Sequence, residues 1–180
     1  MNVAEQLWAT DNHDARILAT MIADPEKMTA AKLDAWARDL ENYPVKDAFR
    51  KLASQAPLAK KRMEKWITAG GEWVCSAGWT VLCHLAMSSE DHPDTELETY
   101  LKSIETTIHG SKNRVKHAMN NTLIAIGIRN PHLEKKAAAA AKRIGKVGVD
   151  HGETNCKSPD AAAYVQRTVA RKSKRRVGCG

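Results

Sequence analysis

Apolar residues recur every three or four positions along almost the whole chain, whereas alternating β-branched residues are scarce. That period matches one face of an α-helix and not one face of a β-strand. One example is the segment 72–87, whose apolar stripe consists of Val74, Ala77, Val81 and Leu85. A stripe of this width is typical of a helix that packs on a core. The pattern therefore predicts an all-α fold.

Capping residues, prolines and glycines divide this pattern into separate helices. Asp11 or Asn12 is expected to cap a helix that runs to about Ala23, and Thr29 a helix that ends near Asn42. Later helices are expected over 44–54, 57–68, 72–87, 95–109, 111–127 and 131–144, with a last one after Ser158-Pro159. Eight to ten helices with short connections fit either stacked antiparallel helix pairs or a compact bundle.

Three of these helix starts carry specific cap predictions. Thr95 and Glu98, three residues apart, form the pattern of a capping box, in which each side chain accepts from a backbone N–H near the other. Ser111 is expected to cap the next helix, and Asn130-Pro131 the one after it. These three predicted helix starts mark the connections between helices in the second half of the chain.

The length of the chain indicates its domain content, and its net charge indicates which partners suit it. A chain of 180 residues is long enough for one domain with a real core, expected over 1–168, followed by a basic, disordered tail over 169–180. Lysine and arginine exceed the acids by 28 to 21, a net charge of +7 that suits a polyanionic partner without requiring one. The chain is expected to be a monomer.

The lack of a recognisable targeting signal and the spacing of the cysteines indicate a cytoplasmic protein. The first residues contain early acids and no apolar core of the signal-peptide type, and no apolar run of 18 residues occurs. We therefore expect no membrane segment. The cysteines, Cys75, Cys83, Cys156 and Cys179, form no C-x-x-C pair, so we interpret them as free thiols.

Common catalytic and cofactor motifs are absent from the sequence. It contains no GxGxxG, P-loop, GxSxG or HExxH pattern, so no cofactor is expected. The segment VDHGETNCK offers four possible metal ligands, Asp150, His151, Glu153 and Cys156. Zinc needs about four converging ligands, and no second cluster accompanies this one. The segment is therefore predicted to be a hydrogen-bonded loop without a metal.

Basic residues gather in the second half of the chain. Lys142, Arg143 and Lys146 flank Gly145 and Gly148 near a predicted helix end, where cations and flexible backbone N–H groups can hold phosphate. The alternative is that these cations only complement the helix dipole.

A second basic group is expected on the helix 111–127. Arg114 and Asn121 lie seven residues apart, so they share one side of that helix. Lys116 is a further basic residue in this half of the chain. This polar side suits either a phosphate backbone or plain solvent.

Three stretches of the chain resemble a known family. IGIRN, AKRIGKVGVDHGET and SPDAAAY are similar to the C-terminal part of the DNA alkylation repair family, the AlkD-like glycosylases. LWATDNHDARILATMIADP resembles the helix pair that begins many members, so the resemblance covers roughly Leu7 to Arg167. It implies stacked antiparallel helix pairs in a HEAT-like repeat superhelix. One missing N-terminal repeat would explain why the chain is short for such a member.

The resemblance implies a chemistry as well. Family members hold double-stranded DNA and release N3- or N7-alkylated purines, using an aspartate four residues after a tryptophan. Here the matching residues are Asp47 and Tyr43, so the carboxylate is kept and the tryptophan is replaced. A second lesion-facing tryptophan corresponds to Asn121, and an arginine-rich turn corresponds to the stretch that begins at Trp73. From the residues alone, Asp47 is equally well a first-turn acid that favours the helix dipole.

Two functions follow from these observations. The first is a DNA-binding member of the alkylation repair family, with a glycosylase activity for alkylated purines carried by Asp47 and Tyr43. Binding to DNA is assigned to Trp73, Arg114, Lys116, Asn121, Lys142, Arg143 and Lys146. The second is a non-catalytic helical-repeat module for DNA structures or a protein partner. A scaffold that binds no nucleic acid is a third alternative.

Overall fold

The computed structural model describes residues 2–88 and 92–177, with side chains up to residue 171. Over these residues the chain forms ten α-helices and two short 3₁₀ helices. They are α1 (Val3–Ala9), α2 (His13–Ile22), η1 (Pro25–Lys27), α3 (Ala30–Arg38), α4 (Tyr43–Gln55), α5 (Ala59–Ile67), α6 (Glu72–Ser88), α7 (Asp94–Thr107), η2 (Ile108–Gly110), α8 (Asn113–Gly127), α9 (Pro131–Ile144) and α10 (Ala161–Val177). The predicted all-α fold is confirmed.

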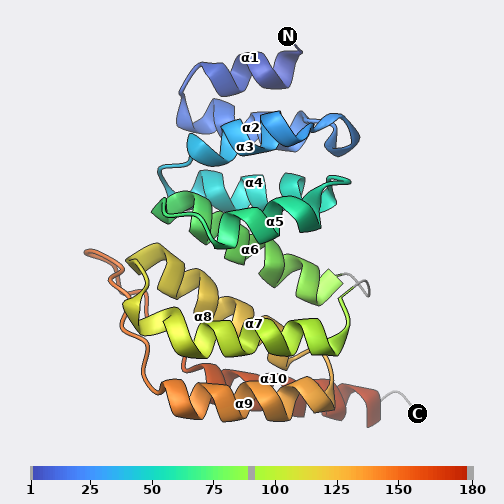
Figure 1. Cartoon of the computed structure of the whole chain (residues 1–180), viewed down its shortest axis with the longest axis vertical. Coiled ribbons are helices and arrows are strands. Elements are labelled where there is room, and N and C mark those ends of the chain that lie inside the picture. The colour runs from blue at the N-terminus through green and yellow to red at the C-terminus, as the bar shows by residue number, and fades with distance from the viewer. Residues whose placement is uncertain (1, 89–91, 178–180) are drawn as a thin grey trace. The chain divides into compact units, whose positions relative to one another are not determined.

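The helices pack as two compact units, Met1–His84 and Leu85–Gly180. In the first unit α1 packs on α2, α2 on α4, and α3 on both α4 and α5. In the second unit α7, α8 and α9 pack on one another, and α10 packs on α8 and α9 (Figure 1). Each unit is thus built from successive helix pairs stacked on one another. The stacked-pair architecture is confirmed, whereas a single domain over 1–168 stays a prediction.

The core of the first unit is built around aromatic side chains. Trp8 and Trp36 stack face to face with ring centroids 4.1 Å apart, and Phe49 lies between Trp8 and Trp66 at 6.2 and 5.7 Å. All four rings are at most 5% exposed. Aromatic pairs at these distances add packing energy beyond the area they bury. Trp36 and Trp66 are therefore core residues joining α1, α3, α4 and α5.

One carboxylate ties α3 to α5. Asp34 accepts hydrogen bonds from Arg62 at 3.0 Å, Lys65 at 2.6 Å and the Trp66 indole at 2.8 Å. Burial by itself raises the pKa of Asp34, but the hydrogen bonds from Lys65 and Trp66 outweigh it, so the pKa lies below its ordinary value of 3.8. The ionised carboxylate therefore stabilises the fold of the first unit.

This lowered pKa predicts a loss of stability in acid. A group whose pKa is lower in the folded than in the unfolded state stabilises above its unfolded pKa and ceases to do so as the pH falls through its folded pKa. We expect the first unit to lose stability below about pH 4, and Asp34→Asn to be less stable at neutral pH with a shallower loss in acid. Urea unfolding followed by tryptophan fluorescence measures this, and an equally steep loss in Asp34→Asn would contradict it.

A row of polar contacts joins α7 to α9 in the second unit. The Asn130 amide donates to Asp94 at 3.0 Å, and Glu98 binds both His132 at 2.6 Å and Lys136 at 3.0 Å. Beneath this row, the core is formed by Leu97, Leu101, Ile104, Ile108, Leu123, Ile126, Leu133, Ala137 and Val165. Polar contacts outside and apolar packing inside hold the two helices in register.

Cap predictions were right at three helix starts. The side chains of Asn12, Thr29 and Asn130 cap α2, α3 and α9, as expected. Thr95 and Glu98 form no capping box, because α7 begins at Asp94 after Pro93 without a side-chain cap.

Two further cap predictions, at Ser111 and after Ser158-Pro159, were displaced. Lys112 is the residue before α8, while the Ser111 hydroxyl donates backwards to Thr107 at 2.9 Å. Asp160 caps α10 through the Ala163 N–H at 2.9 Å.

The structure also differs from the sequence expectation at both chain ends. A short helix at Val3–Ala9 opens with a capping box between Asn2 and Glu5, which the sequence interpretation missed. At the other end α10 continues to Val177, so most of the segment expected to be a disordered tail is helical. Cys179 lies outside the described residues.

No helix within residues 2–88 and 92–177 combines the length and the apolar character that crossing a membrane requires.

Candidate nucleic-acid interface

The start of α4 presents Tyr43 and Asp47 to solvent. Asn42 caps the helix by accepting from the Val45 N–H at 3.0 Å, and Pro44 occupies the first turn, where its missing N–H costs nothing. Tyr43 is 60% exposed, and the Asp47 side chain is 52% exposed. Because four residues separate them, the two side chains share one side of α4. The carboxylate and the ring are therefore next to each other and accessible.

A lysine that the sequence interpretation missed lies beneath them. Lys46 is only 3% exposed, and its Nζ lies 3.3 Å from the Ser76 hydroxyl on α6 and 3.7 Å from Asp47. The buried ammonium therefore forms an ion pair with the exposed carboxylate. Lys46 lies three and seven residues before the buried Phe49 and Ala53. That helical spacing is the signal that it faces inward.

Further basic side chains surround this site. Burial lowers the pKa of His84, and the positive charges of Arg50 and Lys51 lower it further, so the imidazole is neutral at neutral pH. Burial also raises the pKa of the Cys83 thiol to about 11, which leaves it protonated and unreactive. The exposed side of α4 therefore offers one carboxylate among cations.

Trp73 and Trp79 differ in their exposure to solvent. Trp79 is 2% exposed, whereas Trp73 is half-buried in the first turn of α6, three residues before Ser76. The contact between Lys46 and Ser76 holds α4 against that part of α6. The first unit thus carries Tyr43, Asp47 and Trp73 on two adjoining helices.

In the second unit, the polar side of α8 holds the loop between α9 and α10. The Asn113 side chain makes two hydrogen bonds to the backbone of Asp150, both 2.7 Å long. The buried Asn120 amide donates to the Pro159 carbonyl oxygen at 3.0 Å, and His117 packs edge-on against His151, ring centroids 5.5 Å apart. Part of the surface that suits a phosphate backbone is therefore occupied by protein.

Asn121, the residue in place of the second tryptophan, takes part in the same arrangement. Its amide lies 3.1 Å from Nε2 of His117, so it is hydrogen-bonded to the residue that packs on His151. Arg114 and Lys116 are half-buried on α8. Arg114 lies seven residues from Asn121 and shares its side of the helix, whereas Lys116, two residues from Arg114, lies on another side.

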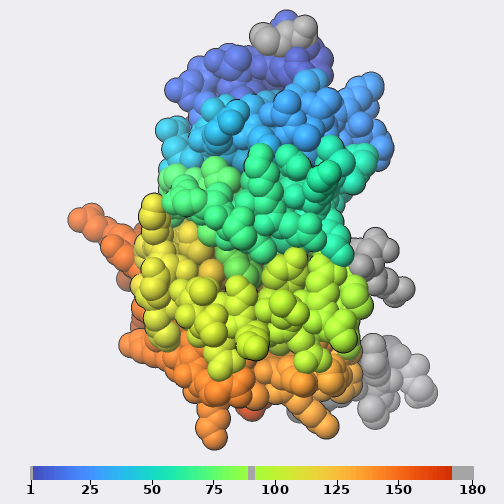
Figure 2. Space-filling model, viewed as in Figure 1, coloured from blue at the N-terminus to red at the C-terminus, as the bar shows by residue number. Residues whose placement is uncertain are grey.

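The loop itself is closed by its own hydrogen bonds. His151 bonds the Ser158 hydroxyl at 3.0 Å, and the Gly152 N–H donates to Asp150 at 2.8 Å. Gly152 has φ +64°, a conformation that favours glycine. In the described part of the chain, no three His, Cys, Asp or Glu side chains lie close enough together to hold a metal ion. Glu153 and Cys156 are exposed. The predicted hydrogen-bonded loop is confirmed, and Figure 2 shows this segment (orange) standing out from the surface.

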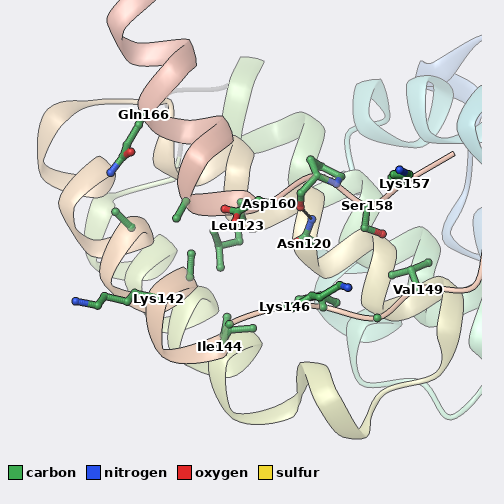
Figure 3. Close-up of a pocket in the computed structure, with 18 of the residues that line it drawn as sticks. Asn120, Leu123, Lys142, Ile144, Lys146, Val149, Lys157, Ser158, Asp160 and Gln166 are labelled. Atoms are coloured by element: carbon green, nitrogen blue, oxygen red, sulfur yellow. Dashed lines mark hydrogen bonds between the residues drawn. The ribbon is translucent and has the colours of Figure 1, made fainter.

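The basic residues at the end of α9 divide into two groups. Arg143 points to α7, where it forms a two-pronged ion pair with Glu105, one N–O distance being 2.8 Å. Lys142 and Lys146 instead line a cavity of about 1110 Å³ between α8, α9, α10 and the loop (Figure 3). Lys157, which the sequence interpretation missed, lines it as well. Arg143 is thus separated by its ion pair from the two lysines predicted to act with it.

Comparisons with known proteins agree with this architecture. Residues 1–165 match the model of a family described as DNA alkylation repair enzyme. Two uncharacterized proteins, Lin0241 of Listeria innocua and Lmo0209 of Listeria monocytogenes, are each 30% identical over 172 residues, covering 92% of this chain and 72% of theirs.

A solved structure is similar too, with a TM-score of 0.87 and 32% identity, covering 94% of this chain and 73% of the other. It is described as belonging to a new family related to the HEAT-like repeat DNA glycosylases, with affinity for branched DNA structures. The match over residues 1–165 shows that this chain belongs to the DNA alkylation repair enzyme family.

Proposed function

We propose that this protein binds DNA and prefers branched structures to linear duplex. The observation that carries the proposal is the similarity to a HEAT-like repeat protein with affinity for branched DNA, at a TM-score of 0.87 over 94% of this chain. The clusters of cations in each unit support it, because phosphate contacts supply most of the affinity of such proteins. DNA contacts are assigned to Trp73, Arg114, Lys116, Asn121, Lys142, Arg143 and Lys146.

Binding to a four-way junction and to a linear duplex of the same sequence tests this function. We expect tighter binding to the junction and a clear loss of affinity with salt, with a log–log slope of about −0.9 for each phosphate contact. Fluorescence anisotropy at several salt concentrations gives both quantities. Equal affinity for the two DNAs would contradict the branch preference, and a flat salt response would favour a protein partner instead.

Matched variants locate the contacts. Arg114→Gln and Lys116→Gln should each weaken binding and reduce the salt slope by about one contact. Lys135→Gln removes the same charge from an exposed position on α9 that does not line the cavity, so it should leave the slope unchanged. An equal effect of all three substitutions would indicate a response to net charge alone.

A second activity, release of alkylated purines, is favoured by the exposure of Tyr43 and Asp47 one helical turn apart. The resemblance gives these positions to the ring and the carboxylate of a glycosylase site. The alternative is a non-catalytic module that uses the same surface for DNA or a protein partner. Monomeric state and binding to ordinary duplex DNA belong to the proposal as well.

A further inference from the structure

The cavity in the second unit is a formed feature of the fold. Three of its walls are helices, α8, α9 and α10, and the fourth is the segment that follows Ile144. Three side chains outside it fix this segment: His109 bonds Ile144 O at 2.9 Å, directly before its start, while Asn113 bonds Asp150 and Asn120 bonds Pro159. Since the loop is held at its beginning, middle and end, the space beneath it is maintained.

The inner walls are apolar and built from small side chains. Leu123 and Ile144 line it together with five alanines, Ala138, Ala139, Ala141, Ala161 and Ala162, and the loop adds Val147, Val149 and Pro159. Alanine leaves room that a longer side chain would fill. The resulting volume of about 1110 Å³ is slightly above the usual range for small-molecule sites, which is roughly 300–1,000 Å³.

Polar groups lie at opposite ends of this apolar space. In Figure 3, Gln166 lies near one end and Lys157 near the other, with Leu123 and Asn120 between them. Lys146 and Lys157 are exposed lysines on the loop, so their ammonium groups can reach an anion at the rim. An acidic residue, Asp160, also lines the cavity, but its carboxylate accepts from the backbone of α10.

We propose that this cavity binds a single nucleotide. Lys146 and Lys157 hold its phosphate, the apolar walls cover the faces of the base, and the Gln166 side chain bonds the base edge. An amide suits this role because it both donates and accepts, as base edges do. The source of the nucleotide is either an unpaired residue at a DNA branch, which rests on the proposed function, or a free nucleotide.

The first test uses free dAMP, with adenosine and inorganic phosphate as partial ligands, in calorimetric titrations of the full chain. We expect dAMP to bind more tightly than either partial ligand. The double variant Lys146→Gln/Lys157→Gln should weaken dAMP binding about tenfold or more, because two charge-assisted hydrogen bonds are lost. Lys135→Gln is the matched control. An unchanged affinity in the double variant, or no dAMP binding by the wild type, would overturn the proposal.

A cavity-filling variant tests the same site without changing its charge. Ala162→Phe should abolish dAMP binding while the helix content in circular dichroism stays at the wild-type level. If this variant does not fold, the lysine variants, whose side chains are exposed, still decide the question. Undiminished dAMP binding by a folded Ala162→Phe protein would place the ligand elsewhere and overturn the proposal.

The second test identifies the source of the nucleotide. A junction with an unpaired nucleotide at its branch should bind more tightly than a fully paired junction, and the double lysine variant should remove that difference. If dAMP binds but the unpaired nucleotide adds nothing, the cavity serves a free nucleotide. Failure of the wild type to bind either junction would refute the proposed function alone, since dAMP binding is measured separately.

Discussion

Replacing Gly78 by alanine is expected to destabilise the first unit by about 3 kcal/mol, an overpacking cost at the high end of its usual range. A Cβ at this position would lie 2.6 Å from the backbone nitrogen of Ile67 and 2.9 Å from the carbonyl carbon of Trp66. These are backbone atoms of α5 and its end, so no side-chain rotation relieves the overlap. The higher helix propensity of alanine, about 1 kcal/mol, is too small to offset it.

Tryptophan fluorescence is the right measurement for this substitution. All five tryptophans, at positions 8, 36, 66, 73 and 79, belong to the first unit, so urea unfolding followed by their emission reports on that unit. Gly70→Ala is the control, because a Cβ there meets no heavy atom within 4 Å. Equal midpoints for Gly78→Ala and the wild type would show that α5 and α6 separate without cost.

The sequence predicted this fold well where local chemistry decides it. Apolar spacing located the helices, and Asn12, Thr29 and Asn130 cap them as expected, because an N-cap bond joins residues only two or three positions apart. The close approach of α5 to α6 at Gly78 could not be predicted in this way. It depends on which helices meet, and a glycine inside a helical pattern does not reveal that.

Tertiary contacts overrode the local pattern at Glu98. Thr95 and Glu98 have the spacing of a capping box, yet Glu98 binds His132 and Lys136 on α9. Two cationic or hydrogen-bonding partners are a stronger attraction than one backbone N–H. His132 and Lys136 lie 34 and 38 residues after Glu98, so the sequence around Thr95 does not reveal these contacts.

The candidate sites show the same contrast between features that local spacing reveals and features that depend on tertiary contacts. Tyr43 and Asp47 are both exposed at the start of α4, and the basic residues of α9 lie near its end as expected. Polar residues on α8 were harder to interpret, because a polar stripe looks the same whether it faces solvent, phosphate or a loop. Asn113 and Asn120 bind the backbone of the loop, a function that only the folded chain reveals.

Loss of the Asp47 carboxylate has the largest expected effect on chemistry. The glycosylase part of the proposal predicts that Asp47→Asn lowers release of 7-methylguanine or 3-methyladenine from methylated DNA by about a hundredfold or more. Asparagine keeps the size of the side chain but removes the charge that stabilises a cationic sugar as the base leaves. Tyr43 in place of tryptophan and Asn121 in place of a second ring predict slow release by the wild type.

Binding and release should respond differently to this substitution. A carboxylate near phosphates contributes nothing favourable to ground-state affinity, so the affinity of Asp47→Asn for unmodified DNA should stay the same or rise slightly. Asp14→Asn on α2 is the matched control, because its side chain is 94% exposed and belongs to no proposed site. Base release measured by chromatography, with DNA binding measured on the same proteins, separates the two effects.

The position of Lys46 makes the test of Asp47 sharper. Its ammonium lies 3.7 Å from the carboxylate and is almost fully buried, so Asp47→Asn removes the partner of a buried cation as well as a surface charge. Unfolding in urea must therefore accompany the activity measurement. A stable Asp47→Asn protein that binds DNA but releases no base would support the carboxylate as the catalytic group. Undiminished release would place the site elsewhere, and a wild type that binds DNA without releasing any base would leave the non-catalytic module as the function.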